Sequence, residues 1–226
     1  MKRYAIYYVP PHDAFAKAAA SWLGYDVQTG CDVAQPDFAS LPREIEVVTA
    51  DPRKYGFHGT IKPPFRLAAG ATPEDLAWAT EALCLRLSPV VLTGLRLERI
   101  GGFLALVPEA DTVALFDLAA RVVEALDAFR APPTADEIAR RSPGRLTPRQ
   151  RDYLDRWGYP FVMDEFRFHM TLTGDLPPDD ADTVARVLAR WIAPHLPRPC
   201  IVDNLCLFGE AEDGRFHLLH RYTLTG

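Results

Sequence analysis

Short hydrophobic runs and amphipathic stretches alternate along the chain, a pattern that predicts a mixed fold of strands and helices. Strands are predicted where apolar residues alternate or cluster over a few positions: 3–9, 55–62, 90–98, 103–107, 166–173, 201–208 and 215–224. Helices are predicted where apolar residues recur every three or four positions: 13–23, 72–87, 111–129, 135–141, 147–157 and 177–192. Residues 25–52 are weakly patterned and are predicted to be a loop with an edge strand at 44–49.

The order of these predicted elements repeats. Strand, helix, strand, strand follows His58 and again follows His169, and the distance to the next strand, at Val90 and at Ile201, is the same. Duplicated β-α-β-β units predict an α+β fold of two pseudo-symmetric lobes with antiparallel sheets around a central cleft. We expect one bilobal domain over residues 1–226, with lobe 1 at about 50–110, a connecting helix and Arg-rich insert at about 111–160, and lobe 2 at about 161–226 together with strand 3–9.

The second predicted strand of this pair, residues 166–173, alternates apolar and polar residues without interruption. Successive side chains of a strand point to opposite faces, so the four apolar residues should be buried. The opposite face should then carry Arg167, His169, Thr171 and Thr173. This strand is predicted to expose a cation, an imidazole and a hydroxyl together.

The first predicted strand, residues 55–62, has the same parity. Its polar face should carry His58, Thr60 and Lys62, and Pro63-Pro64 should end it. Each lobe is therefore predicted to offer one imidazole, one hydroxyl and one cation on one face.

Both strands contain Phe-His-x-Thr followed by an aliphatic residue, at residues 57–61 and 168–172. These paired elements resemble the signature of the two-histidine (2H) phosphoesterase superfamily, which includes RNA 2′,3′-cyclic phosphodiesterases. The wider segments 55–65 and 157–169 resemble one bacterial branch of it, proteins of phosphonate-degradation operons, and the similarity spans the whole chain. Gly59 departs from this pattern, in which Ala is expected, and a slightly looser strand should result.

The resemblance implies a phosphoesterase that hydrolyses a small cyclic phosphodiester, such as a ribose or nucleoside cyclic phosphate, in phosphonate catabolism. Two histidines suit this chemistry, because one can act as general base and the other as general acid at a pKa of about 6.5. Thr60 and Thr171 can donate hydrogen bonds to the phosphate oxygens, and Lys62 and Arg167 can offset its charge. The predicted catalytic residues are His58, Thr60, His169 and Thr171, with no metal and no cofactor.

Two further features are predicted to bind substrate, each with an open alternative. The segment 140–151 holds five arginines, among them Arg141 and Arg145, and is either a lid that clamps a second phosphate or a solvated helical segment balanced by nearby acids. Tyr7, on the first strand, either stacks on a base or sugar or packs within the fold.

The amino-acid composition limits the class of protein, its compartment and the ligands it could bind. The apolar fraction of 48% and the charged fraction of 24% are typical of a globular protein, and no segment is apolar enough to span a membrane. A net charge of −5 argues against binding of long nucleic acid but allows a small anionic phosphoester. The four cysteines match no zinc or redox motif, which suits a reducing cytoplasm. We expect a cytoplasmic monomer.

Two other functions remain open from the sequence. A non-catalytic protein could use the same cleft to bind a nucleotide or phosphate ester, although binding alone would not require both histidines and both threonines. A metal-dependent hydrolase could bind zinc through His58 and His169, but the sequence lacks the usual closely spaced pair of ligands.

Overall fold

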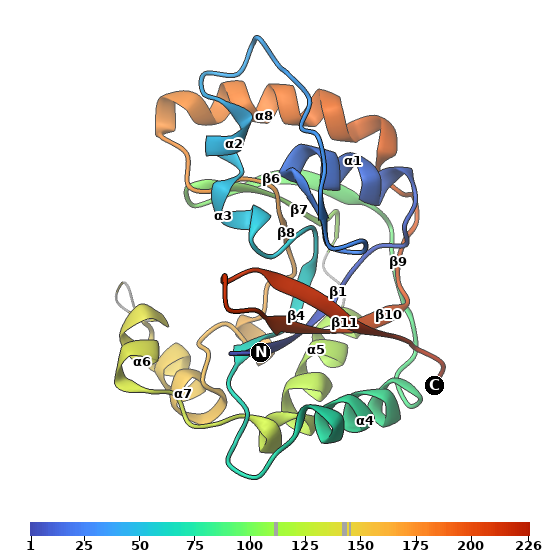
Figure 1. The fold of residues 1–226 in the computed structure, drawn as a ribbon, viewed down its shortest axis with the longest axis vertical. Coiled ribbons are helices and arrows are strands. Elements are labelled where there is room, and N and C mark those ends of the chain that lie inside the picture. Colours follow the sequence, from blue (N-terminus) through green and yellow to red (C-terminus); the bar gives the residue numbers. More distant parts are fainter. Residues whose placement is uncertain (111–112, 142–143, 145) are drawn as a thin grey trace.

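The computed structural model describes residues 1–110, 113–141, 144 and 146–226. Its main elements form two antiparallel sheets, each covered by helices, with α6 and α7 set to one side (Figure 1). The α+β class and the antiparallel pairing are as predicted. Among the described residues, no helix has both the length and the apolar character needed to cross a membrane.

The larger sheet has four strands in the order β11-β10-β1-β4. Its strands are β1 (Tyr4–Tyr8), β4 (Gly59–Phe65), β10 (Asn204–Glu210) and β11 (Phe216–Thr223). Two helices, α4 (Pro73–Cys84) and α5 (Val113–Ala125), lie below it in Figure 1. The helix predicted from residue 111 is thus observed from Val113, and Asp111 lies outside the described residues.

The smaller sheet has three strands in the order β6-β7-β8. These strands are β6 (Leu95–Ile100), β7 (Phe103–Pro108) and β8 (Met170–Thr171). The covering helices, above the sheet in Figure 1, are α1 (Ala14–Leu23) and α8 (Pro178–Ile192). The indole of Trp22 in α1 donates a hydrogen bond to the carbonyl of Leu172, which ties this helix to the segment after His169 (2.8 Å).

The remaining elements are short. Two further strand pairs are β2 (Tyr25–Asp26) with β3 (Cys31–Asp32) and β5 (Val90–Leu92) with β9 (Cys200–Val202). The insert contains α6 (Ala135–Arg141) and α7 (Pro148–Trp157), both as predicted, and α7 begins with a capping box between Thr147 and Gln150. Three single turns of 3-10 helix lie at Asp127–Phe129, Met163–Glu165 and Ala193–His195.

The two repeated units exchange strands. β4, which opens the first unit, pairs with β1 in the sheet that contains the β10–β11 hairpin of the second unit. β8, which opens the second unit, pairs with β7 of the first. The order of elements repeats in the two units, but the strands predicted at 90–98 and 201–208 are each observed as two strands, because β5 and β9 pair with each other while β6 and β10 join the two larger sheets. Each sheet also draws strands from both halves of the chain, so the sheets do not follow the contiguous bounds 50–110 and 161–226.

The predicted edge strand at 44–49 is wrong, because this segment forms two short helices, α2 (Ile45–Val48) and α3 (Ala50–Arg53). Ile45 and Val48, three residues apart, are buried, while Val47 between them is exposed. This is helical spacing, and the Thr49 hydroxyl reinforces the turn by donating to the Ile45 carbonyl (2.8 Å).

Both strands that carry the histidines differ from their predicted bounds. β4 starts at Gly59 and continues through Pro63-Pro64 to Phe65. It is the edge strand of its sheet. Proline is tolerated there, because the N–H that it lacks would point away from the sheet and would have no strand to bond. β8 is reduced to two residues, although burial still alternates across the segment around it.

Candidate active site

His58 lies just before β4, after a turn at Gly56, which has a positive φ of 71°. The turn places the Gly56 carbonyl 2.8 Å from Nδ1 of His58. A carbonyl can only accept a hydrogen bond, so Nδ1 carries the proton and Nε2 of the neutral ring has a free lone pair. Nε2 lies 3.2 Å from the Thr60 hydroxyl, which donates to it. The element therefore presents a base with its tautomer fixed.

His169 has the same local arrangement. Its Nδ1 lies 2.8 Å from the carbonyl of Arg167, again two residues earlier in the chain. The same argument leaves Nε2 as the reactive nitrogen. Thr171 pairs with Ala105 of β7, on the partly exposed side of the strand. The two elements are thus alike in three dimensions as well as in sequence.

The two histidine strands are in direct contact. A Cβ atom built on Gly59 would lie 2.4 Å from the ring of Phe168, a distance that real Cβ atoms essentially never show. Glycine allows this close approach, whereas the methyl group of an alanine would force Phe168 or the strand to move; the looser strand expected at Gly59 stays a prediction. Burial is the main cause that lowers the pKa of His58, and the charge of a protonated His169 acts in the same direction.

His58 is enclosed by aromatic rings. Tyr7 stacks on it at 3.9 Å between ring centroids and 27° between planes, and Tyr55 and Phe208 lie at 6.0 and 6.5 Å. Burial lowers its pKa to about 4, against the opposing effect of the Gly56 carbonyl. Tyr7 itself is 1% exposed, which favours packing over contact with substrate.

His169 has a more open setting. Phe103 lies beside it at 5.8 Å. Burial lowers its pKa below the usual value, and the Arg167 carbonyl works in the opposite direction. Both imidazoles of the free protein therefore favour the neutral form near pH 7, more strongly so for His58.

The prediction that Lys62 shares a face with His58 and Thr60 is wrong. The β1–β4 register shifts between Ile6 and Tyr7, so Thr60 faces Tyr7 while Lys62 faces Ile6. Neighbouring residues of β1 point to opposite faces, and this irregularity therefore turns Lys62 away from Thr60. The Lys62 ammonium donates instead to the carbonyl of Val123 (3.0 Å) and pairs with Asp127 (3.4 Å). Burial lowers its pKa to about 8.

The other predicted substrate-binding residues are dispersed. Arg167 is exposed, two residues before His169 in the sequence. Arg141 is half-buried at the end of α6 and donates to the carbonyls of Gly158 and Pro64. Arg145 lies outside the described residues.

The sequence interpretation missed Tyr55 as a neighbour of His58. Simple alternation assigned it to the face opposite the histidine, whereas its ring stacks on Phe216 (4.9 Å) on the same side as Tyr7. The missed signal was Gly56, since an isolated glycine within a strand pattern often marks a bulge or turn.

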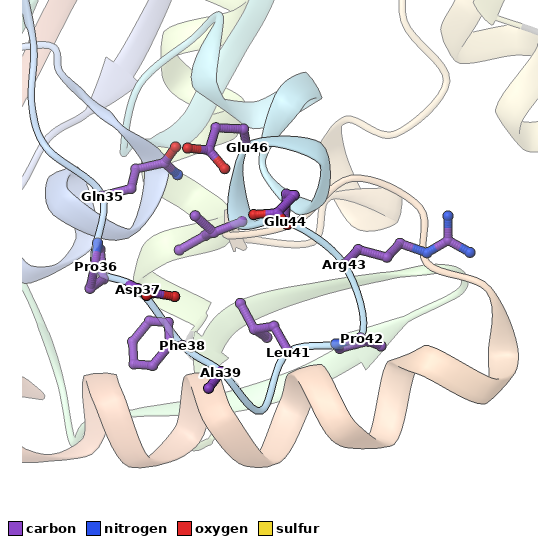
Figure 2. A pocket seen from close by; sticks show the side chains of 11 residues that line it. Gln35, Pro36, Asp37, Phe38, Ala39, Leu41, Pro42, Arg43, Glu44 and Glu46 are labelled. Carbon is purple, nitrogen blue, oxygen red and sulfur yellow. The ribbon is translucent and has the colours of Figure 1, made fainter.

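A cavity of about 350 Å³ lies elsewhere, under the loop of residues 35–46 (Figure 2). Phe38 and Leu41 line it beside α8, and Arg43 forms an ion pair with Asp180 of that helix. Its lining includes neither histidine, and the central cleft stays a prediction. In the part of the chain that the structure describes, no group of three or more His, Cys, Asp or Glu could hold a metal ion.

Comparison with protein families gives one match. A family model described as "Protein of unknown function (DUF1045)" matches residues 60–217. This segment contains Thr60 and the whole of the second His-x-Thr element.

Two curated relatives share the name "Ribose 1,5-bisphosphate phosphokinase PhnN". The protein of Janthinobacterium sp. (strain Marseille) is 40% identical over 220 residues, and that of Laribacter hongkongensis (strain HLHK9) is 34% identical over 216 residues. The alignments cover 95% and 94% of this chain but 49% of each relative. The chain thus spans about half the length of the curated relatives it matches.

Among solved structures, E. coli LigT complexed with NADP+ aligns over 100% of this chain and 98% of that chain, with 14% identity and a TM-score of 0.48. TT0787 of Thermus thermophilus aligns over 99% and 98%, with 16% identity and a TM-score of 0.47. Both are distant likenesses.

Proposed function

We propose that this chain, which belongs to the family described as protein of unknown function (DUF1045), is a phosphoesterase that opens a small cyclic phosphodiester through His58 and His169. One observation carries the proposal. Two histidines on contacting strands each bind a carbonyl through Nδ1 at 2.8 Å and keep Nε2 for chemistry. Packing alone does not require the same tautomer to be fixed twice.

In the proposed reaction, Nε2 of one histidine removes a proton from water as the water oxygen attacks phosphorus. The bond from phosphorus to one ring oxygen breaks, and the other histidine, protonated at Nε2, donates its proton to that oxygen. The product is an acyclic phosphomonoester with a free hydroxyl. We assign His58 as the base, because its pKa of about 4 keeps it unprotonated. His169 is then the acid.

The two threonines complete the proposed site. Thr60 already lies within hydrogen-bond distance of His58 Nε2, so a phosphate oxygen near this nitrogen would also lie near the hydroxyl. Thr171 occupies the equivalent position after His169. Hydroxyl donors placed before the reaction stabilise the charge that develops on the phosphate oxygens. The exposed Arg167 is placed to attract the anion.

The favoured substrate is a ribose or nucleoside cyclic phosphate, with phosphonate catabolism as its setting. The relatives' name refers to a ribose phosphate, which supports a sugar substrate. We do not extend the phosphokinase activity to this chain, because the chain corresponds to about half of those proteins. Its sequence also contains no G-x-x-x-x-G-K-[S/T] segment, the phosphate-binding loop of one large class of kinases.

The test is a screen of ribose and nucleoside cyclic phosphates, with product detected as phosphomonoester, in the presence and absence of excess EDTA. Turnover should survive EDTA and should be lost in His58→Ala and His169→Ala. His220→Ala, which changes an exposed histidine on β11, is the matched control and should retain full activity.

Each alternative has its own signature in this screen. Loss of turnover on chelation with recovery on added metal would indicate a metal-dependent hydrolase. Tight binding of a cyclic phosphate without turnover under any condition would indicate a binding protein.

A further inference from the structure

A second group of cations surrounds a small cavity beside β4. It consists of Lys62 on β4, Arg130 after α5 and Arg141 at the end of α6. They line a small cavity of about 10 Å³, room for roughly one water molecule. The other lining residues are Pro63, Pro64, Phe65, Val123, Trp157 and Val162.

Positive charge exceeds negative charge around this cavity. Asp127 is shared by two of the cations, at 3.4 Å from Lys62 and at 2.8 and 3.0 Å from Arg130. Among the described residues no carboxylate forms an ion pair with Arg141, since Glu137 of the same helix is paired with Arg66 (3.1 Å). Among the described residues, Asp127 therefore forms ion pairs with two of the three cations, and the charge of Arg141 is offset only by the longer-range attraction of Glu137.

Unused hydrogen-bond donors accompany this charge. A lysine has three N–H donors, and Lys62, only 2% exposed, uses two of them, on Val123 and Asp127. An arginine has five, and Arg141 uses two, both on main-chain carbonyls. Burying such groups costs free energy unless another group offsets the charge. An anion would supply both the charge and the acceptors.

We propose that the cavity of Lys62, Arg130 and Arg141 is an oxyanion site that accepts the phosphomonoester group of a substrate carrying one beside its cyclic phosphodiester. The role of this group in catalysis rests on the proposed function, whereas binding of the anion does not. To admit a phosphate, the Arg141 side chain leaves the carbonyls of Pro64 and Gly158 and turns its guanidinium to the ligand. A guanidinium binds two oxygens of a phosphate in parallel, which a carbonyl cannot match.

Aromatic side chains lie near both this site and His58. The Arg141 guanidinium lies over the ring of Tyr159 (5.8 Å). Tyr159 is in turn an electrostatic neighbour of Tyr55, whose ring lies 6.0 Å from His58. The hydrogen bond from Arg141 to Pro64 also ties the insert to the strand that begins immediately after His58. In the proposal, the sugar that carries the two phosphates lies against these aromatic rings.

Binding of the anion is tested by thermal unfolding against increasing inorganic phosphate at constant ionic strength, in a His58→Asn/His169→Asn background that removes the histidine site. The Tm should rise by several degrees and saturate, because the ligand binds only the folded state. Arg140→Gln, an exposed neighbour in α6, should leave the rise intact, and Arg141→Gln should abolish it. An undiminished rise in Arg141→Gln, or no rise in the parent, would overturn the site.

Arg141→Lys covers the case in which the glutamine variant does not fold. It keeps the charge but not the two parallel donors, so the midpoint of the phosphate titration should move about 10-fold or more to higher concentration. An unchanged midpoint would count against the assignment.

The role in catalysis is tested with a nucleoside 2′,3′-cyclic phosphate with and without a 5′-phosphate. The wild-type chain should prefer the 5′-phosphorylated substrate by about 10- to 100-fold in kcat/KM, and Arg141→Gln should remove the preference. Equal rates on both in the wild type would exclude this role. Absence of turnover on any cyclic phosphodiester would instead refute the proposed function, while the unfolding titration would still decide whether the anion binds.

Discussion

The His58 and His169 elements share one local arrangement but differ in their surroundings. Each imidazole binds a carbonyl two residues earlier at 2.8 Å. His58 is covered by the stacked ring of Tyr7, whereas His169 has Phe103 at 5.8 Å. Burial lowers the pKa of both imidazoles, that of His58 to about 4. The repeated backbone geometry fixes the tautomer in both, and the neighbours of each ring set its basicity. A duplicated motif can in this way supply two different proton-transfer groups.

Removing either imidazole should give the largest effect. His58→Ala and His169→Ala should each lower kcat by about 10²- to 10⁴-fold, because each removes one proton-transfer partner. The double variant should fall by less than the product of the two effects, since the pair acts as a unit. Steady-state kinetics on the best cyclic phosphodiester from the screen measures this. Near-full kcat in His58→Ala would show that His58 is not a proton-transfer group, and the comparison of the two histidines would then fail.

Removing either hydroxyl should cost less. Thr60→Val and Thr171→Val each delete one hydrogen bond to a charged phosphate, worth about 1.5 to 3 kcal/mol, or roughly 10- to 100-fold in kcat/KM. Thr223→Val, an exposed threonine at the end of β11, is the control. Equal losses would support equivalent roles for the two hydroxyls. A loss at Thr60 alone would show that the two elements differ in more than basicity.

Gly59, the residue between His58 and Thr60, should not tolerate a larger side chain. Gly59→Ala would place a methyl group 2.4 Å from the Phe168 ring, and such overpacking typically costs about 1 to 3 kcal/mol. Urea unfolding should show this loss of stability, and Phe168→Leu added to Gly59→Ala should recover part of it. If Gly59→Ala were as stable as wild type, the contact between the two strands would not be a tight constraint.

The smallest expected effect is the change of kcat/KM with pH. A base acts when unprotonated, so kcat/KM should fall as the pH drops through the His58 pKa of about 4. An acid acts when protonated, so kcat/KM should also fall as the pH rises through the His169 pKa, which lies below its usual value. The optimum for the free protein should therefore be acidic.

Titration of the imidazole signals by NMR, assigned with His58→Asn and His169→Asn, checks this order directly. His58 should titrate below His169. The reverse order would exchange the proposed roles of base and acid.

Local patterns predicted the His169 side of the site well. Phe166, Phe168, Met170 and Leu172 are all buried, as alternation requires. The prediction is wrong at the end of the segment, because Thr173 is buried, where its hydroxyl accepts a hydrogen bond from the Leu104 N–H. On the His58 side, the Gly56 turn and the register shift between β1 and β4 break the alternation. Whether a strand bulges depends on its partner, which one segment of sequence does not reveal.

Helix starts were also predicted, because the signals are local. Asp13, Thr72 and Thr147 each cap a helix through a side-chain oxygen, as their sequence positions indicate. Strand exchange between the two units was not predicted, because pairing partners lie far apart in the chain. The monomeric state, the cytoplasmic location and the role of Arg145 stay predictions.

The position of β1 has a consequence for the order of folding. Residues 4–8 pair with 59–65 on one side and with 204–210 on the other. As the ribosome makes the chain, the sheet behind His169 has all its strands once residue 171 has emerged, whereas the sheet behind His58 must wait for residue 223. Contacts between such distant residues form slowly. The half of the site around His169 can thus form early. One edge of β1 stays unpaired until residues 204–210 have been synthesised, and until then it can pair with other chains.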